Sequence, residues 1–319
     1  MKPIRTLRYA VPLPTAAIEV LPIHVSTRLD ERRIVIDAPA KLNLGLEVIG
    51  RRHDGFHEIA TIFVAIDLSD RVTLSPADDL VLGVDDDTLA GEENLALRAL
   101  RLLRDETNHR GGARIDLCKR IPAAAGLGGA SSDAAAALLG GRELWGLDVS
   151  DARLYDLAAS LGSDVPFFLR GGCAMGQGRG DLLEALPFPS DLWFVVVVPD
   201  VRIPAKTASL YTRLVAEDFS DGSRIASQVD RLRSGLAPDV TLLGNAFGRP
   251  LHAMVPGLAA LPDIMRDAGA EAVAISGAGP THYTVAAEAG QAEGVATRLR
   301  ERLGDRANVF VARPTPARP

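Results

Sequence analysis

The spacing of hydrophobic residues predicts that the ordered chain begins with a strand at about residue 34. An apolar run at 34–36 leads into a segment in which every second residue from 42 to 46 is leucine, with Lys41 and Asn43 at alternate positions. This alternation is typical of a strand with one buried face, so Lys41 and Asn43 should project together from the other face. Comparable patterns predict strands over 58–67, 70–75, 113–119, 193–198, 272–276, 283–285 and 309–312.

Helical periodicity lies between these strands. It predicts helices over 92–105, 150–161, 203–215, 258–267 and 290–303, and an alanine-rich helix that follows residue 132. A glycine-rich run at 171–180 predicts a hairpin, and 162–168 is expected to be a loop that leads into an apolar segment. Because strands and helices interleave irregularly, the pattern favours an α+β fold over a doubly wound sheet.

Chain length and proline positions predict two domains. A chain of 319 residues is long enough to bury two cores. Pro187 and Pro189 precede a predicted strand and mark a plausible boundary. We therefore expect an N-terminal domain at 34–186 and a C-terminal domain at 187–319, after an irregular, proline-interrupted leader at 1–33.

The stretch 122–137 joins a glycine-bearing loop to the alanine-rich helix. Gly126, Gly128 and Gly129 lack a Cβ, so a bulky anion can approach the backbone. Ser131 or Ser132 is expected to cap the helix, whose first turn would direct unpaired N–H groups into the loop. This arrangement suits phosphate, although a simple turn before a well-packed helix would look similar. The loop has neither a P-loop ending nor a complete Gly-x-Gly-x-x-Gly.

Composition excludes several classes of function. A net charge of −6 provides no global basic field for nucleic acid. No apolar run is long enough to cross a bilayer, and the first 33 residues lack the apolar core of a secretory signal. Cys118 and Cys173 have no metal-ligand spacing, so we interpret them as buried thiols of a cytoplasmic protein.

Two charged residues outside the loop are candidates for catalysis. Lys41 is either a solvated lysine or a cation held in position by its strand. Asp164 precedes the apolar sequence Val-Pro-Phe-Phe at 165–168. It is either a structural cap or a partly desolvated acid, whose pKa burial would raise and a nearby lysine would lower.

Two further features could bind a ligand. His57 follows Phe56 after a glycine turn, and is either a half-buried turn residue or a hydrogen-bonding group beside an aromatic ring. His53 is separated from it by that turn, so a metal site there is not expected. The glycine-containing turn at 277–281 either adds N–H donors to an anion site or only reverses the chain.

Three segments together resemble a known family. They are Ala-Pro-Ala-Lys-Leu-Asn at 38–43, the glycine loop at 122–132 and Ser-Gly-Ala-Gly-Pro-Thr at 276–281. In this order they are similar to the three motifs of the galactokinase, homoserine kinase, mevalonate kinase and phosphomevalonate kinase (GHMP kinase) family. Asp-Gly-Phe-His at 54–57 and Gly-Ser-Asp-Val-Pro-Phe-Phe at 162–168 narrow the resemblance to members that phosphorylate a cytidylated methylerythritol. The resemblance covers about 34–312.

The resemblance implies a fold and a reaction. The fold would be α+β with two domains, the first like domain 2 of ribosomal protein S5 and the second ferredoxin-like. The reaction would be phosphorylation of the 2-hydroxyl of 4-diphosphocytidyl-2-C-methyl-D-erythritol by ATP with Mg²⁺, in the non-mevalonate isoprenoid pathway. The expected partner is this small molecule, with no nucleic acid or membrane, and the expected state is a monomer or homodimer.

The resemblance also implies roles for matching residues of the reaction and acceptor sites. Asp164 would take the hydroxyl proton as general base, and Lys41 would keep Asp164 ionised. Phe56 would stack on the cytosine, while His57 would bond its edge. Asn43 would contact the erythritol portion.

The implied nucleotide site is built from the glycine loop. Ser131 or Ser132 would lie near Mg²⁺, and Gly277 and Gly279 would support the phosphates. The residues expected to wrap the ATP phosphates are Pro122, Ala123, Ala124, Ala125, Gly126, Leu127, Gly128, Gly129, Ala130, Ser131 and Ser132.

The chain departs from the family pattern at a few positions. Ala130 stands where glycine is frequent and Ala124 at another glycine-tolerant position, which narrows the approach of phosphate to the backbone. Phe56 stands where tyrosine is common, which keeps the stacking ring and loses a hydroxyl. The segment 203–207 resembles the family's substrate-side loop only loosely, so no role is assigned there.

Three alternative functions are considered. A sibling kinase for homoserine or mevalonate would keep the loop and Asp164, but has no need for the aromatic–histidine pair at 56–57. A nucleotide-binding regulator on the same scaffold could dispense with Lys41 and Asp164. A dinucleotide-binding oxidoreductase fails on the incomplete glycine fingerprint.

Overall fold

Two β-sheets form the frame of the protein in a computed structural model that describes residues 24–25 and 33–318. The first sheet has the order β1-β2-β3-β5-β4, and β6 and β7 extend it from β3. Its neighbours are antiparallel except for the parallel pair β4–β5. Its strands are β1 (His24–Val25), β2 (Ile34–Arg51), β3 (His57–Ala77), β4 (Leu80–Val84), β5 (Gly112–Cys118), β6 (Cys173–Gln177) and β7 (Leu182–Ala185).

The second sheet is antiparallel, with the order β11-β8-β10-β9. Its strands are β8 (Trp193–Pro199), β9 (Ala274–Ile275), β10 (His282–Ala286) and β11 (Ala307–Ala312). The described helices are α1 (Leu95–Glu106), α2 (Gly129–Trp145), α3 (Asp151–Leu161), α4 (Val165–Arg170), α5 (Lys206–Tyr211), α6 (Ser223–Arg233), α7 (Gly248–Met254), α8 (Leu261–Asp267) and α9 (Ala289–Leu303). The predicted α+β class is confirmed.

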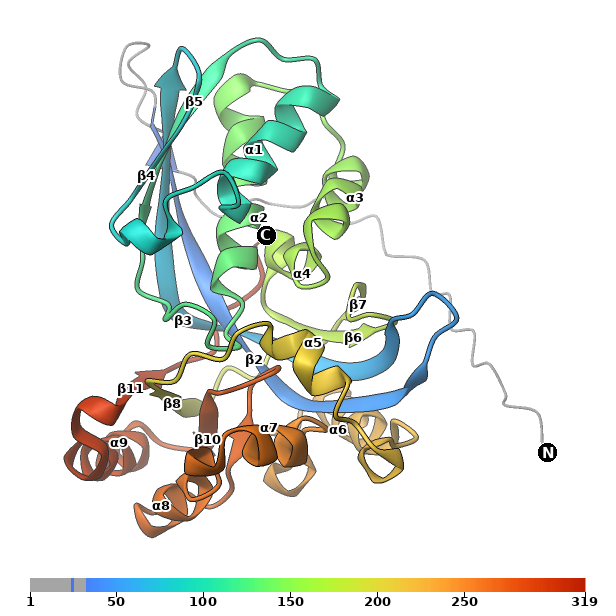
Figure 1. Ribbon diagram of the computed structural model, residues 1–319, viewed down its shortest axis with the longest axis vertical. Coiled ribbons are helices and arrows are strands. Elements are labelled where there is room, and N and C mark those ends of the chain that lie inside the picture. Colours follow the sequence, from blue (N-terminus) through green and yellow to red (C-terminus); the bar gives the residue numbers. More distant parts are fainter. Residues whose placement is uncertain (1–23, 26–32, 319) are drawn as a thin grey trace.

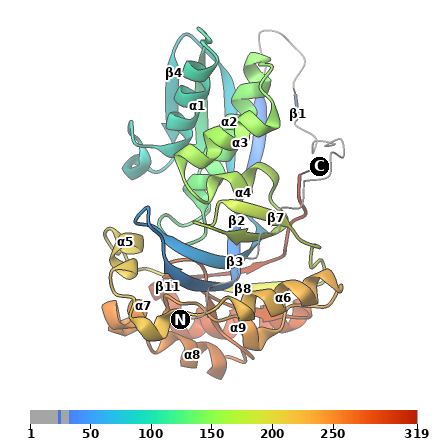
Figure 2. The same cartoon turned by 90° about the vertical axis from the view of Figure 1, so that its right-hand side faces the viewer.

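The long strands β2 and β3 connect the two halves of the molecule. In Figure 1 both strands run from the part that holds α1–α4 toward the part that holds β8 and α6–α9, and Figure 2 shows the same two parts from the side. One apolar core lies between β2–β3 and the second sheet, with Leu42, Leu44, Phe194 and Tyr283 among its members. The residues on β2 therefore reach both halves of the protein.

The two predicted strands at 58–67 and 70–75 are a single strand, β3, so that prediction was wrong. Polar residues around 67–70 resembled a turn. In the structure, Pro39 pairs with Ser69 and Ala40 with Ile66, so that a bulge takes up the two extra residues without ending the strand. Asp70 accepts hydrogen bonds from the amides of Arg120 and Ile121.

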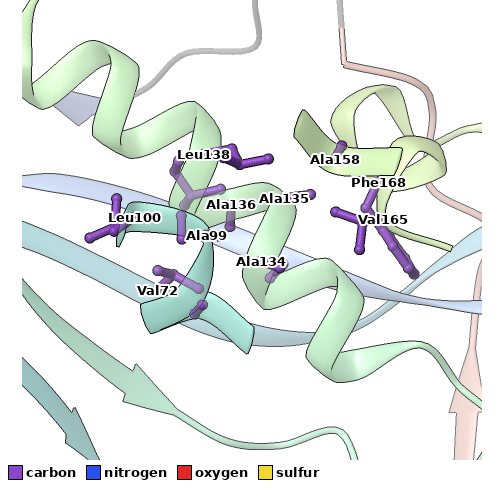
Figure 3. Close-up of a cluster of buried hydrophobic side chains, with 14 of the residues drawn as sticks. Val72, Ala99, Leu100, Ala134, Ala135, Ala136, Leu138, Ala158, Val165 and Phe168 are labelled. Carbon is purple, nitrogen blue, oxygen red and sulfur yellow. The ribbon is translucent and has the colours of Figure 1, made fainter. Parts of the chain in front are cut away.

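Helix α2 packs through small side chains at the centre of the half that holds α1–α4. Ala134, Ala135 and Ala136 are fully buried, and Figure 3 shows them between Leu100 of α1 and Phe168 of α4. A second small pair, at 140–141, lies against the side chains of Leu74 and Leu100 in the same way. The alanine-rich composition thus allows α2 to approach its neighbours closely, which fixes the position of the glycine loop before it.

Several other predictions need correction. The segment 162–168, expected to be a loop, contains the start of helix α4, and Pro166 lies in the first turn of this helix. Cys118 is exposed, whereas Cys173 is buried as predicted. The helix predicted over 203–215 is only the six residues of α5. The elements β4, α6 and α7 were not predicted. Five residues in β4 and seven in α7 are too few for a clear periodicity, whereas α6 has a one-sided apolar pattern that was missed.

Other boundaries agree more closely with the pattern. Ser150 accepts a hydrogen bond from the amide of Arg153 as the N-cap of α3, and the run at 171–180 contributes to the β6–β7 hairpin. The predicted irregular leader lies largely outside the described residues, but His24–Val25 pairs with β2 and is therefore a strand. Among the described residues, no helix is long and apolar enough to span a membrane.

Candidate active site

The glycine loop leads directly into α2, but the two serines do not cap that helix. The N-cap is Gly128, with a φ of +75° and no side-chain cap, and Ser132 already donates its amide to the carbonyl of Gly128. A left-handed backbone favours glycine at this point. Space also requires it, because a Cβ on Gly128 would lie 2.6 Å from the ring of Phe168 and 3.1 Å from Cγ of Lys41. The predicted serine cap was wrong.

The turn at 277–281 packs against this loop, although it belongs to the other half of the chain. The Ser276 hydroxyl donates to the carbonyl of Gly126 at 3.0 Å, and the Thr281 amide donates to the carbonyl of Ala125 at 3.3 Å. A Cβ on Gly126, whose φ is +86°, would lie 2.5 Å from the carbonyl oxygen of Ser276. Gly277 and Gly279 also have positive φ. The loop and the turn therefore meet backbone to backbone.

Lys41 lies at this junction and pairs with Asp164. Its Nζ is 3.7 Å from Oδ2 of Asp164 and donates to Oδ1 of Asn43 at 2.7 Å. Lys41 is 3% exposed, and Asp164 is 37% exposed. Burial lowers the pKa of Lys41, and the charge of Asp164 acts in the opposite direction. Asp164 is the N-cap residue of α4, but its carboxylate makes no cap hydrogen bond, which leaves it available to other groups.

Asn43 is buried and holds Lys41 in place. Its amide nitrogen donates to the Thr61 hydroxyl at 2.8 Å, which in turn donates to the carbonyl of Gly45. The Asn43 oxygen therefore faces Lys41 in a fixed orientation. A contact between Asn43 and an acceptor stays a prediction.

A cavity of about 470 Å³ opens beside the loop and the start of α2. Its lining includes the loop, residues 88–91 and 93–95, and the side of α2 that carries Ser131 and Asp133. Lys119 also lines it and donates to Oδ2 of Asp133 at 2.5 Å and to Asp70. Burial raises the pKa of Asp133 to about 7, against the influence of Lys119. The cavity is therefore bordered by backbone amides and by a buried charge cluster.

Two buried polar atoms at the start of α2 have no hydrogen-bond partner among the described residues. They are Oγ of Ser132 and Oδ1 of Asp133. Because buried polar groups are normally paired, such atoms call for a ligand, an ion or water. In the described part of the chain, no group of three or more histidine, cysteine or acidic side chains is arranged to hold a metal.

An aromatic group lies near the turn at 54–57. The His57 ring stacks on Tyr211 of α5, with centroids 4.4 Å apart, and its buried Nε2 has no partner among the described residues. Burial lowers the pKa of His57, and Arg51 adds to the effect. Phe56 is 51% exposed, and the guanidinium of Arg179 lies 4.8 Å from its ring centroid. Phe56 therefore has an exposed ring and His57 an unused hydrogen-bonding atom, and the two side chains contact different partners.

Four residues of this site were not found from the sequence. Lys119 precedes the glycine loop and Asp133 follows it, so their closeness to the loop was the sequence signal that could have identified them. Tyr211 and Lys206 lie on the short helix α5, and their partners are distant in the sequence: His57 for Tyr211, and the carbonyls of Ala124 and Gly279 for Lys206. No local pattern marks them.

Comparison with known proteins identifies the family. Residues 94–172 match the model of the GHMP kinases N terminal domain, and residues 236–305 match GHMP kinases C terminal. The chain is 38% identical over 257 residues to a 4-diphosphocytidyl-2-C-methyl-D-erythritol kinase of Dehalococcoides mccartyi, covering 80% of this chain and 90% of the relative. It is 41% identical over 268 residues to the kinase of that name from Pelotomaculum thermopropionicum, covering 82% and 92%. The chain belongs to the GHMP kinase family.

Solved structures agree with the assignment of this chain to the GHMP kinase family. A crystal structure of 4-(cytidine 5'-diphospho)-2C-methyl-D-erythritol kinase has a TM-score of 0.74 and 36% identity, covering 88% of this chain and all of that one. A homoserine kinase from Cytophaga hutchinsonii has a TM-score of 0.72 at 20% identity, covering 92% and 98%. The second likeness concerns the fold alone.

Proposed function

We propose that this GHMP kinase transfers the γ-phosphoryl group of ATP to the 2-hydroxyl of 4-diphosphocytidyl-2-C-methyl-D-erythritol. The observation that carries the kinase chemistry is the pairing of buried Lys41 with partly exposed Asp164, 3.7 Å apart, beside the glycine loop at Gly128. The names of its relatives support the choice of acceptor. We further propose a cytoplasmic location, which two free cysteines suit.

The proposed mechanism uses Asp164 as general base. Its carboxylate accepts the proton of the 2-hydroxyl while that oxygen forms a bond to the γ-phosphorus, and the bond from this phosphorus to the β,γ-bridging oxygen breaks to release ADP. Lys41 stabilises the ionised Asp164 and the charge that develops on the transferring group. Phosphoryl transfer depends chiefly on such alignment and charge stabilisation.

The loop and its cavity fit ATP. The first amides of α2 have no helical acceptor, and glycine at 126 and 128 allows the loop to pack closely against Ser276, Phe168 and Lys41, which fixes its conformation. The unpaired Ser132 hydroxyl is a suitable oxygen ligand for Mg²⁺, with Ser131 as the neighbouring candidate. When bound, Mg²⁺ would neutralise charge on the β- and γ-phosphates.

The aromatic group fits the cytidine part of the acceptor. We propose that Phe56 stacks on the base and that Nε2 of His57 bonds its polar edge. The lowered pKa of His57 keeps the ring neutral near pH 7, so that one ring nitrogen can accept a hydrogen bond. Tyr211 supports the orientation of His57 by stacking on its ring.

An acceptor panel tests the proposal. The purified chain is incubated with ATP, Mg²⁺ and either the cytidylated methylerythritol, homoserine or mevalonate, and ADP release is measured together with the phosphorylated product. We expect ADP release with the first acceptor only. Release only with homoserine or mevalonate would reassign the enzyme to a sibling activity, and nucleotide binding without release on any acceptor would favour a regulator.

A further inference from the structure

Lys206 joins the two backbone segments that border the proposed phosphate site. It is the first residue of α5, and its Nζ donates to the carbonyl of Ala124 at 2.6 Å and to the carbonyl of Gly279. Ala124 belongs to the glycine loop and Gly279 to the turn at 277–281. Among the described residues, no carboxylate lies within ion-pair distance of Lys206. Its partners are therefore the two carbonyls.

The backbone is strained on both sides of this contact. Ala124 has a φ of +55° and Ala205, directly before Lys206, a φ of +45°. Among the described residues, Asn108 is the one further non-glycine residue with positive φ. A left-handed conformation is unfavourable for residues with a Cβ and persists only where the surroundings hold it. The loop conformation around Ala124 therefore depends on contacts such as that of Lys206.

The direction of the Ala124 carbonyl also sets the direction of the next amide. In a trans peptide unit, the N–H of residue 125 points away from the C=O of residue 124. With the carbonyl held toward Lys206, the amide of Ala125 faces the opposite side of the loop. Ala124 and Ala125 both line the cavity. The lysine thus constrains how the loop presents its N–H donors.

The short helix α5, which carries Lys206, is held in place at both of its ends. At the other end of α5, Tyr211 stacks on His57 and packs edge-on against Phe247, with centroids 4.4 Å and 4.9 Å apart. The side chain of Lys206 is half-buried, and its environment is electropositive because Lys41 lies nearby. Burial and Lys41 lower its pKa to about 8. An anion bound between the two lysines would stabilise both charges.

We propose that Lys206 is a positioning residue of the ATP site, which holds the glycine loop against the turn at 277–281 in the conformation that receives the polyphosphate. The proposal rests on the proposed function only in taking ATP as the ligand of the loop. The identity of the acceptor does not enter it.

The test measures binding of a non-hydrolysable ATP analogue with Mg²⁺ by calorimetry, without any acceptor. We expect Lys206→Met to bind the analogue about 10- to 100-fold more weakly, the factor that loss of charge-assisted hydrogen bonds produces. Lys206→Arg, which keeps the charge, should recover part of this loss. Arg213→Met serves as the control, because it removes an exposed cation just after α5, and its affinity should equal that of the wild type.

A pH profile separates positioning by the ammonium from a packing role. The charged group that acts on Lys206 across the site is Lys41, which Asp164 partners. Wild-type affinity for the analogue should fall above about pH 8 as Lys206 loses its proton, and this fall near pH 8 should be absent in Lys206→Arg. Wild-type affinity in Lys206→Met, or the same fall in Lys206→Arg, would overturn the proposal. A failure of the acceptor panel would leave these binding results unchanged, so the two proposals fail separately.

Discussion

Replacement of Asp164 by asparagine tests the central feature of the proposed mechanism. The change keeps the size of the side chain and removes its charge and its ability to accept a proton. Asp164 makes no cap hydrogen bond to α4, so the helix should remain. Asp164 is also partly exposed, which limits the effect on folding. The expected loss is therefore in turnover, with little change in structure.

The magnitude follows from the two roles of the carboxylate. A positioned base contributes about 10²–10⁴-fold to rate, which corresponds to roughly 3–5 kcal/mol of activation free energy. Lys41 is 3% exposed and lies 3.7 Å from the carboxylate, so the neutral variant leaves that cation with Asn43 as its polar neighbour. The pKa of Lys41, already lowered by burial, should fall further. As the pH is raised, Lys41 of the variant should therefore lose its proton earlier, and the activity of the variant should decline at a lower pH than the activity of the wild type.

The assay couples ADP release to product detection at saturating ATP, and calorimetry measures the affinity for an ATP analogue. We expect kcat to fall by about 10²–10⁴-fold, while the dissociation constant for the analogue stays within a few-fold of wild type. Asp148→Asn is the matched control, because this exposed aspartate lies beyond the opposite end of α2. Near-normal turnover of Asp164→Asn would refute the assignment of the base.

Three further predictions concern the frame around the site. Gly126→Ala places a Cβ 2.5 Å from the carbonyl oxygen of Ser276, so it should lower stability by about 1–3 kcal/mol and raise KM for ATP; an unchanged melting temperature and KM would contradict the close packing of loop and turn. Burial lowers the pKa of His282 to about 4, so its contribution to stability is present above about pH 6.5 and is lost as pH falls toward 4. Replacement by glutamine should remove on the order of 3 kcal/mol of that acid dependence in denaturant titrations, and an unaltered pH slope would exclude His282 as its source. Ending the chain after Ala312 removes Arg318, whose amide and guanidinium donate to the carbonyls of Arg170 and Phe168; α4 should then be held less firmly, and we expect lower kcat with nearly unchanged ATP affinity, whereas wild-type kcat would show that the tail is dispensable.

Local sequence determined those elements whose signals are local. The alternation around Lys41 and Asn43 predicts their shared face, and the two side chains are hydrogen-bonded in the structure. Ser150 predicts the start of α3 because a capping hydroxyl needs only the next turn. The resemblance of the ordered motifs also predicted the family, and the comparisons confirm it.

Other features were decided by contacts between distant parts of the chain. Serine is a frequent N-cap residue, which is why Ser131 or Ser132 was expected to begin α2. In the structure α2 begins earlier, at Gly128, where Phe168 and Lys41 approach the backbone so closely that only glycine fits. The polar residues near 67–70 resemble a turn, but their partners come from other segments, so β3 continues through a bulge. The domain boundary near 187 and the roles assigned to individual site residues stay predictions.

The sequence by itself determined the α+β class, and through the resemblance of its motifs it named the glycine loop, Lys41 and Asp164 as candidates, because these signals depend on residue type and short spacing. Only the tertiary structure brought Asp164 to within 3.7 Å of Lys41 and placed Lys206 between Ala124 and Gly279. These pairs are 73 to 123 residues apart along the chain. No periodic pattern extends over such distances, and these contacts form only after distant segments of the chain have folded together.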